Sequence, residues 1–254
     1  FIDAGQSPGQ KVMTVYGQLI AGTASDNSSI ALLDPGSYFA EQFQQSLNAY
    51  GMPTSRAQAT TANAPSGLVE LAGIQSPPLR AFIDPTNLYS VNIYAESMLK
   101  TLGRSVNPST PDAYASGAAA VSQVLTDLGI RPNSISIVDG SGLSRRNQAT
   151  PEAFVDTLQA MAKTSNASVY RNSLAVAGRS GTLRNRMRGT NAEGRFQGKT
   201  GTLRGTYTLS GYLNPPNHPP LALSILVNDT DSSGRDVRSL IDQIVTHASN
   251  LDDC

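Results

Sequence analysis

The residues best suited to chemistry lie in one run, Gly198 to Leu213, in which a lysine stands among hydroxyl side chains and glycines. Thr, Tyr and Leu favour a pleated backbone, so the run is interpreted as a strand. Glycine at Gly201 removes a side chain that would hold a ligand away from that backbone. Lys199 and the hydroxyls of Thr200 and Thr202 could therefore bind a carboxylate. The alternative is an edge strand with one solvated lysine. A matching motif elsewhere in the chain would favour the binding site over this alternative.

The composition limits the classes of function. The 254 residues carry 19 basic and 19 acidic side chains, so charge gives no reason to expect nucleic acid or an anionic membrane as a partner. No apolar run approaches the roughly 20 residues of a membrane span, and the first residues lack the pattern of a secretion signal. The lone cysteine, Cys254, excludes an intrachain disulfide and argues against a catalytic thiol. His218 and His247 are the only histidines, and this small number argues against a Ser-His-Asp triad or a His-based metal site.

Helical and strand patterns surround the Lys199 run and must position it. Apolar residues at helical spacing predict helices at 35–50, 93–103, 111–128, 151–161 and 236–248. Alternating or β-rich segments predict strands at 11–20, 29–33, 134–138 and 221–227. We expect the last of these to pair with the Lys199 run as an antiparallel hairpin across a proline-rich loop.

The same patterns predict which side chains of three segments are buried and which are exposed. The aromatic side chains Phe39, Phe43 and Tyr50 of the first helix are interpreted as core rather than as a cofactor site. The polar, arginine-rich segment 178–198 is interpreted as an exposed lobe in front of the Lys199 strand. The closing helix is expected to direct five apolar side chains inward: Val237, Leu240, Ile241, Ile244 and Val245.

The partner for Lys199 is a Ser-x-Asn motif, Ser90 and Asn92, at the start of the helix predicted from residue 93. Ser-x-Asn and Lys-Thr-Gly are two of the three motifs of active-site serine penicillin-recognising enzymes, and Ser-x-x-Lys is the third. Matching context occurs in the same order at 76–79, 139–144 and 181–183. Over residues 76 to about 227 the sequence therefore resembles the D-alanyl-D-alanine carboxypeptidase/endopeptidases of the class C low-molecular-mass penicillin-binding proteins.

The resemblance implies a fold and a domain organisation. The expected fold is mixed α/β: a penicillin-recognising serine transpeptidase/β-lactamase-like domain with an antiparallel sheet and helices. In the family this domain is split by inserted domains. Residues 1–72 are then the C-terminal part of an inserted α/β domain, and 73–254 are the C-terminal part of the transpeptidase-like domain, with the Ala-, Thr- and Asn-rich segment 58–66 near the boundary. The resemblance also implies an extracytoplasmic location.

The resemblance further implies acyl transfer through a serine ester, with peptidoglycan peptides ending in D-Ala-D-Ala as substrates and β-lactam antibiotics as ligands. Ser90 would relay a proton between the nucleophile's lysine and the leaving amine, Asn92 would hold the substrate amide, and Lys199 would supply positive potential. No metal or organic cofactor is needed.

The same resemblance assigns substrate binding to the Lys-Thr-Gly strand. The hydroxyls of Thr200 and Thr202 would bind the terminal carboxylate, and the backbone N–H of Thr202 would be one of two oxyanion donors. Gly201 would let the strand approach the substrate.

The sequence departs from the family because the Ser-x-x-Lys that should precede the insertion is not found. Ser97 and Lys100 match it literally, but the apolar stripe of their helix already fixes which face is buried, so the match is interpreted as coincidence. Ser141 and Ser144 lie in a Gly/Ser loop that is better interpreted as structural. The alternatives are a fragment or pseudoenzyme that binds wall peptide without turnover, or a β-lactamase, which would need a deacylating glutamate that the span after Ser-x-Asn lacks.

Overall fold

The computed structural model of the protein describes residues 2–6, 12–23, 32–62 and 64–252. These form two compact units, Phe1–Gly73 and Ile74–Cys254. Within the described residues, no helix is both long and apolar enough to cross a membrane. Cys254 and most of the strand predicted at 29–33 lie outside the described residues.

The first unit contains a hairpin of β1 (Ile2–Gln6) and β2 (Met13–Gly17), followed by the helix α1 (Pro35–Ala49). Asp34 caps α1 by accepting a hydrogen bond from the backbone N–H of Ser37 at 3.0 Å. The prediction that the aromatics of this helix are core is wrong: Phe39, Phe43 and Tyr50 are 71%, 56% and 84% exposed. The physical reason is that the described residues of this unit supply no layer over the helix, whose residues are all at least partly exposed.

The second unit is built on a four-stranded antiparallel sheet in the order β5-β6-β7-β8. Its strands are β5 (Ala175–Val176), β6 (Phe196–Leu203), β7 (Thr206–Leu213) and β8 (Leu221–Val227). The run around Lys199, predicted as one strand, is in fact the β6–β7 hairpin, because Gly205 adopts a φ of 72° and lets the chain reverse. The predicted partner strand 221–227 pairs with the second half of the run, as Leu209 opposite Ile225 shows.

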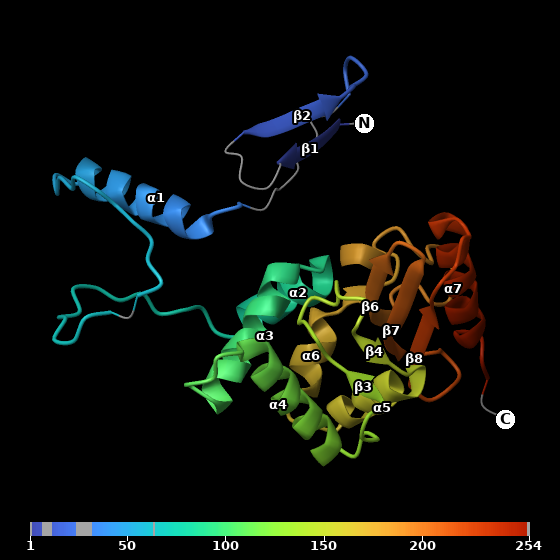
Figure 1. Ribbon diagram of the computed structural model, residues 1–254. Coiled ribbons are helices and arrows are strands. Elements are labelled where there is room, and N and C mark those ends of the chain that lie inside the picture. The colour runs from blue at the N-terminus through green and yellow to red at the C-terminus, as the bar shows by residue number, and fades with distance from the viewer. Residues whose placement is uncertain (1, 7–11, 24–31, 63, 253–254) are drawn as a thin grey trace. The chain divides into compact units, whose positions relative to one another are not determined.

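Helices cover both faces of this sheet (Figure 1). The helices are α2 (Arg80–Tyr89), α3 (Asn92–Val106), α4 (Ala113–Asp127), α5 (Pro151–Ala162), α6 (Ala167–Ser173) and α7 (Gly234–Ala248), with a short 3₁₀ helix η1 (Gly181–Leu183). Two short strands, β3 (Ile135–Ser136) and β4 (Gln148–Ala149), form a separate pair. On the α5 side, the Tyr212 hydroxyl donates to the Leu158 carbonyl at 2.7 Å. The mixed α/β class with an antiparallel sheet is therefore confirmed.

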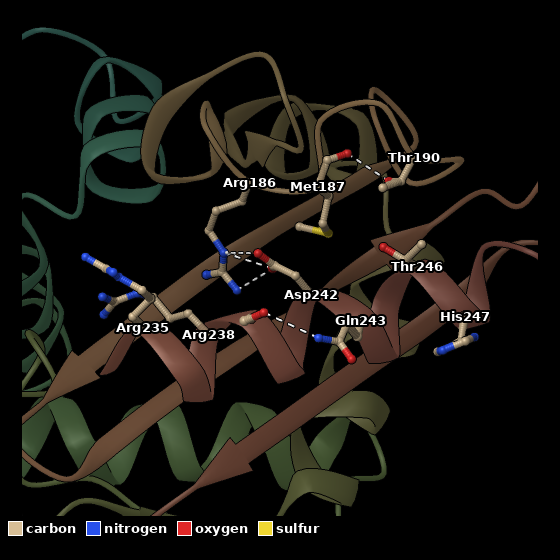
Figure 2. A pocket seen from close by; sticks show the side chains of 10 residues that line it. Arg186, Met187, Thr190, Arg235, Arg238, Asp242, Gln243, Thr246 and His247 are labelled. Carbon is tan, nitrogen blue, oxygen red and sulfur yellow. Dashed lines mark hydrogen bonds and ion pairs between the residues drawn. The ribbon is translucent and has the colours of Figure 1, made fainter. Parts of the chain in front are cut away.

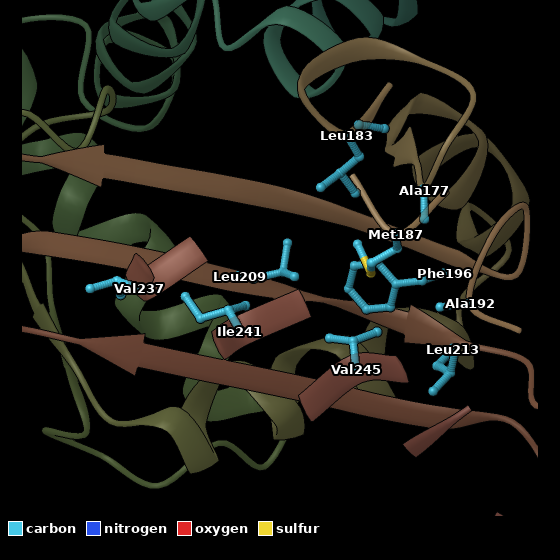
Figure 3. Close-up of a cluster of buried hydrophobic side chains, with 11 residues drawn as sticks. Ala177, Leu183, Met187, Ala192, Phe196, Leu209, Leu213, Val237, Ile241 and Val245 are labelled. Atoms are coloured by element: carbon cyan, nitrogen blue, oxygen red, sulfur yellow. The ribbon is translucent and has the colours of Figure 1, made fainter. Parts of the chain in front are cut away.

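The main core lies between α7 and the sheet (Figure 3). Val237, Ile241 and Val245 form one buried stripe of α7, at intervals of four residues. Leu240 and Ile244, predicted to point inward, are 56% and 45% exposed. The sheet meets only the narrow stripe, so residues one position away from it on the helix stay at the surface.

The arginine-rich segment 178–198 is not simply an exposed lobe. Leu183, Met187 and Ala192 within it are buried in the main core. Arg186 is bound to Asp242 of α7, with Nη2 and Nε donating to Oδ1 at 2.6 and 2.9 Å (Figure 2). Apolar residues spaced four or five apart thus fix this segment to the sheet, while its polar residues face solvent. A hollow of about 480 Å³ lies beside the Arg186–Asp242 pair, and Lys199 is not among the residues that line it.

Close backbone contact joins α3 to α4. The predicted helix end at Gly103 is wrong, because Gly103 lies buried inside α3, which continues to Val106. A Cβ on Gly103 would overlap the carbonyl oxygen of Ala113, and one on Gly117 would overlap the carbonyl of Leu99. The two glycines therefore allow the helices to cross at short distance, and they fix the helix that begins at Asn92.

Candidate active site

Ser90 lies in the turn between α2 and α3. It follows the last residue of α2 and has φ 61° and ψ 48°, the left-handed region. A residue with a Cβ occupies this region at a cost in conformational energy, and such residues concentrate at functional sites. The turn separates the two helices and leaves the Ser90 hydroxyl free to meet a partner from the sheet.

That partner is Lys199 of β6. Its Nζ donates to Ser90 Oγ at 2.8 Å, although 109 residues separate the two in sequence, and also to the carbonyl of Thr200 at 2.8 Å. Burial lowers the pKa of the Lys199 ammonium below its ordinary value. Among the described residues no carboxylate forms an ion pair with it, so its charge is available to an anion. The predicted meeting of Ser90 and Lys199 is confirmed.

The edge of β6 next to this pair is open. The carbonyl of Phe196 accepts from the N–H of Ala177 on the β5 side, at 2.9 Å. Backbone polar groups of alternate residues point to the same edge, so Thr200 and Thr202 direct theirs to that side as well. Since β5 pairs no further along β6 than Gly198, the Thr202 N–H lies at a free strand edge, where it can donate to a ligand.

The hydroxyl of Thr200 is held by a residue to which the sequence assigned no role. Thr200 Oγ1 donates to Oγ1 of Thr182, in η1, at 3.0 Å. The only signal was that Thr182 belongs to the family-like context 181–183. Gly201 also accommodates the neighbouring strand, because a Cβ there would overlap the Thr208 hydroxyl of β7.

Asn92 is the first residue of α3 and is exposed. Within the described part of the chain its side-chain amide forms no hydrogen bond, and the structure does not link it directly to Lys199. Its amide is thus free to bind a ligand two residues from Ser90. Among the described residues, a hydrogen bond therefore joins Ser90 to Lys199, and none joins Asn92 to either of them.

The literal Ser-x-x-Lys of α3 is not assembled as a catalytic pair. Ser97 Oγ donates to the Ile93 carbonyl of its own helix at 2.7 Å. Lys100 Nζ lies 5.0 Å from the centroid of the Tyr114 ring. Each side chain has a local partner that accounts for its position, which agrees with the interpretation as coincidence.

The Gly/Ser loop after β3 is structural. Ser141 Oγ donates to Glu96 Oε1 of α3 at 2.6 Å. The Asp139 carboxylate accepts from the N–H groups of Gly142 and Ser144, at 2.7 and 2.6 Å. These bonds hold the loop against α3.

An antiparallel sheet with helices on both faces, and a Lys-Thr-Gly strand whose lysine meets the serine of a Ser-x-Asn helix start, defines the active-site serine penicillin-recognising class. Within this class the chain belongs to the D-Ala-D-Ala carboxypeptidase 3 (S13) family, whose model matches residues 4–251.

Individual relatives agree with this assignment. The chain is 34% identical over 229 residues to a D-alanyl-D-alanine carboxypeptidase of Actinomadura sp. and 30% identical over 235 residues to a penicillin-sensitive carboxypeptidase A of Dictyostelium discoideum. These matches cover 87% and 85% of this chain but only 42% and 43% of the relatives. The fold is similar to penicillin binding protein 4 of Haemophilus influenzae, solved with a β-lactam: TM-score 0.76, 23% identity, 98% of this chain and 58% of that one.

Proposed function

We propose that the whole protein is a serine-type D-Ala-D-Ala carboxypeptidase/endopeptidase that acts on peptidoglycan peptides through an acyl-enzyme and binds penicillin. The observation that carries the proposal is the 2.8 Å hydrogen bond between Lys199 Nζ and Ser90 Oγ at an open strand edge, in a chain of the S13 family. The carboxypeptidase names of the relatives and the β-lactam bound to the Haemophilus protein support it.

In this proposal the three polar groups near the turn have separate roles. Ser90 relays the proton to the leaving amine, because its hydroxyl can donate and accept at once. Lys199 keeps positive potential beside that hydroxyl and favours the anionic form of the substrate's carboxyl end. Asn92, whose amide has no partner among the described residues, binds the substrate amide.

The substrate lies along the free edge of β6. Its terminal carboxylate is bound by the hydroxyls of Thr200 and Thr202 and by the Lys199 charge. The Thr202 N–H donates to the oxygen that becomes negative in the transition state. When the carboxylate binds, the Thr200 hydroxyl donates its one proton to it and accepts from the Thr182 hydroxyl, 3.0 Å away.

The covalent step needs a serine from a Ser-x-x-Lys outside residues 1–254. Its Oγ attacks the carbonyl carbon between the two D-alanines, its proton passes through the lysine and Ser90 to the amide nitrogen, and the C–N bond breaks to release D-alanine. Water then hydrolyses the serine ester. The proposal places the protein outside the cytoplasm, in the periplasm or cell envelope, and makes residues 1–72 the end of an inserted domain and 73–254 the end of the transpeptidase-like domain.

The test is a fluorescent penicillin, incubated with the whole protein and with residues 1–254 alone and read on a denaturing gel. We expect a label on the whole protein, loss of that label in Lys199→Ala, and no label on residues 1–254. Label on residues 1–254 that Ser97→Ala abolishes would make Ser97 and Lys100 the catalytic pair. Label on neither form would indicate a pseudoenzyme.

A further inference from the structure

The two halves of the site are far apart in sequence, and both are bonded to the same short helix. On the side of Ser90, Asn87 of α2 donates through Nδ2 to Ser173 Oγ of α6 at 2.7 Å. Ser173 is 2% exposed, and its hydroxyl donates in turn to the Tyr170 carbonyl at 2.6 Å. Asn87 lies one helical turn before Ser90, so this bond fixes the end of α2 from which the left-handed turn departs.

On the side of Lys199, Arg171 of α6 donates through Nε to Gln197 Oε1 of β6 at 2.8 Å. Gln197 Nε2 donates back to the Arg171 carbonyl at 3.3 Å. The Arg171 guanidinium also lies 5.3 Å from the centroid of the Tyr212 ring. Gln197 and Lys199 are two positions apart on one strand and thus share a face of the sheet, so the bond fixes the strand just before the lysine.

Arg171 does not act here as a salt-bridge partner. It forms no ion pair with a described carboxylate, and its Nη2 is buried without an acceptor among the described residues. Leaving a buried donor unpaired costs about 1–3 kcal/mol. What the side chain does achieve in the structure is the reciprocal pair with Gln197 and the contact with Tyr212, both of which hold the sheet.

We propose that α6 is the positioning element of the site and aligns Ser90 with Lys199 through the Asn87–Ser173 and Arg171–Gln197 bonds; this rests on the proposed function. Arg171 and Ser173 are two residues apart, so α2 and β6 are both hydrogen-bonded to the same turn of α6. Because a hydrogen bond weakens steeply with misalignment, a small shift of α2 against β6 separates Nζ from Oγ. Asn87, Arg171, Ser173 and Gln197 are positioning residues, since none of them contacts the reacting groups.

The test uses the whole protein with Asn87→Ala, Gln197→Ala and the double variant. Matched controls are Asn191→Ala and Gln123→Ala, which remove exposed side-chain hydrogen bonds of 2.8 Å elsewhere. The rate of penicillin acylation is measured beside the thermal midpoint. We expect each site variant to lose between about tenfold and a hundredfold in rate, the range for misplaced reacting groups. The double variant should lose little more, because either change already breaks the same alignment.

A second readout does not depend on turnover. Competitive acetylation of Lys199 at a series of pH values, followed by mass spectrometry, measures where its amine titrates. We expect Asn87→Ala and Gln197→Ala to raise that pH, because a displaced lysine regains water, whereas the controls leave it unchanged. Gln197→Glu keeps an acceptor for Arg171 Nε and should retain the acylation rate.

The outcomes separate the two levels of the proposal. Rates that fall only as far as the folded fraction falls, together with an unchanged Lys199 titration, would overturn the role of α6. A wild-type protein that takes no penicillin would refute the proposed function. In that case the acetylation of Lys199 still decides whether α6 sets the position of the lysine.

Discussion

At the scale of single residues, the site depends on one serine in an unusual backbone conformation and one lysine in an unusual electrostatic setting. Ser90 has φ 61°, a conformation that glycine would adopt with less strain. A hydroxyl-bearing residue occupies it nonetheless, 2.8 Å from an ammonium, as the proposed proton relay requires.

Two substitutions of Ser90 distinguish the contribution of its hydroxyl to activity from the effect of its backbone strain on stability. Ser90→Ala and Ser90→Gly both remove the hydroxyl, so each should lower penicillin acylation of the whole protein by about 10² to 10⁴, the range for a lost proton-transfer group. The free energy of unfolding should be about 1–2 kcal/mol higher for the glycine variant than for the alanine variant, because alanine retains the left-handed strain. Urea unfolding measures this difference; equal activities of wild type and Ser90→Gly would exclude the relay role.

The lowered pKa of Lys199 predicts two opposite pH effects. Because burial depresses its pKa in the folded state below the ordinary value of 10.5, the unfolded chain binds more protons between the two pKa values. Stability therefore rises with pH in that window, as the cost of burying the charged amine disappears. Carboxylate binding needs the charged amine, so it is fully present below the lowered pKa and lost as pH rises through it.

We expect the penicillin acylation rate to fall with a midpoint below 10.5 when it is followed from about pH 7 to about pH 11. Lys199→Arg is the control. It should be slower overall, because a guanidinium does not reproduce the geometry of an ammonium, but it should lack this alkaline decline, because it stays charged. The same midpoint in both proteins would assign the decline to another group.

At the scale of elements, the site depends on how closely η1 approaches the end of α2. Gly181 has φ 54°, and a Cβ on it would overlap the Leu88 carbonyl, two residues before Ser90. Gly189 also has a positive φ, 70°, but with open space around it. Substituting alanine at Gly181 therefore adds both overlap with α2 and backbone strain, whereas alanine at Gly189 adds backbone strain alone.

Gly181→Ala should destabilise the protein by more than Gly189→Ala, whose cost is about 1–2 kcal/mol from the left-handed conformation alone. It should also slow acylation, because the last turn of α2 must move away and carry Ser90 with it. Gly189→Ala should keep the wild-type rate. Thermal unfolding and fluorescent penicillin labelling of the whole protein measure the two effects, and equal rates in both variants would contradict this role of the close approach.

At the scale of the whole molecule, both core clusters lie within the second unit. Between α1 and α2 the described chain has no helix or strand, and Arg56 in this stretch is exposed. Arg186, in contrast, is 13% exposed and paired with Asp242. The two units should therefore be separable by a protease without loss of the second unit's core.

Limited trypsin digestion of residues 1–254 should cut after Arg56 before it cuts after Arg186. We expect a product of residues 57–254 that resists further digestion and keeps the thermal midpoint of the uncut chain, because its core contacts are intact. Arg56→Gln should remove this cut. Early cleavage at Arg186 would show that the second unit does not fold as tightly as its buried residues indicate.

Much of the site could be predicted from sequence because its chemistry is carried by residue types in short motifs. Lys199, Ser90 and Asn92 follow from two patterns of three residues, and the order of the surrounding motifs indicated the family. Local rules also sufficed for the buried stripe Val237, Ile241 and Val245, since helical periodicity is a property of the sequence itself.

Other features were decided only by the tertiary structure, because they depend on which surfaces meet. Leu240 is exposed because the sheet covers only a narrow stripe of α7, and Phe39 is exposed because no described layer covers α1. Helical periodicity does not encode how wide a covering layer is or whether there is one. The seven residues of α6 are too few to show a helical pattern, yet they bind both halves of the site. The sequence determined which groups could react, and packing alone set the 2.8 Å between Lys199 and Ser90, because a hydrogen bond across 109 residues exists only when separate elements are held against each other.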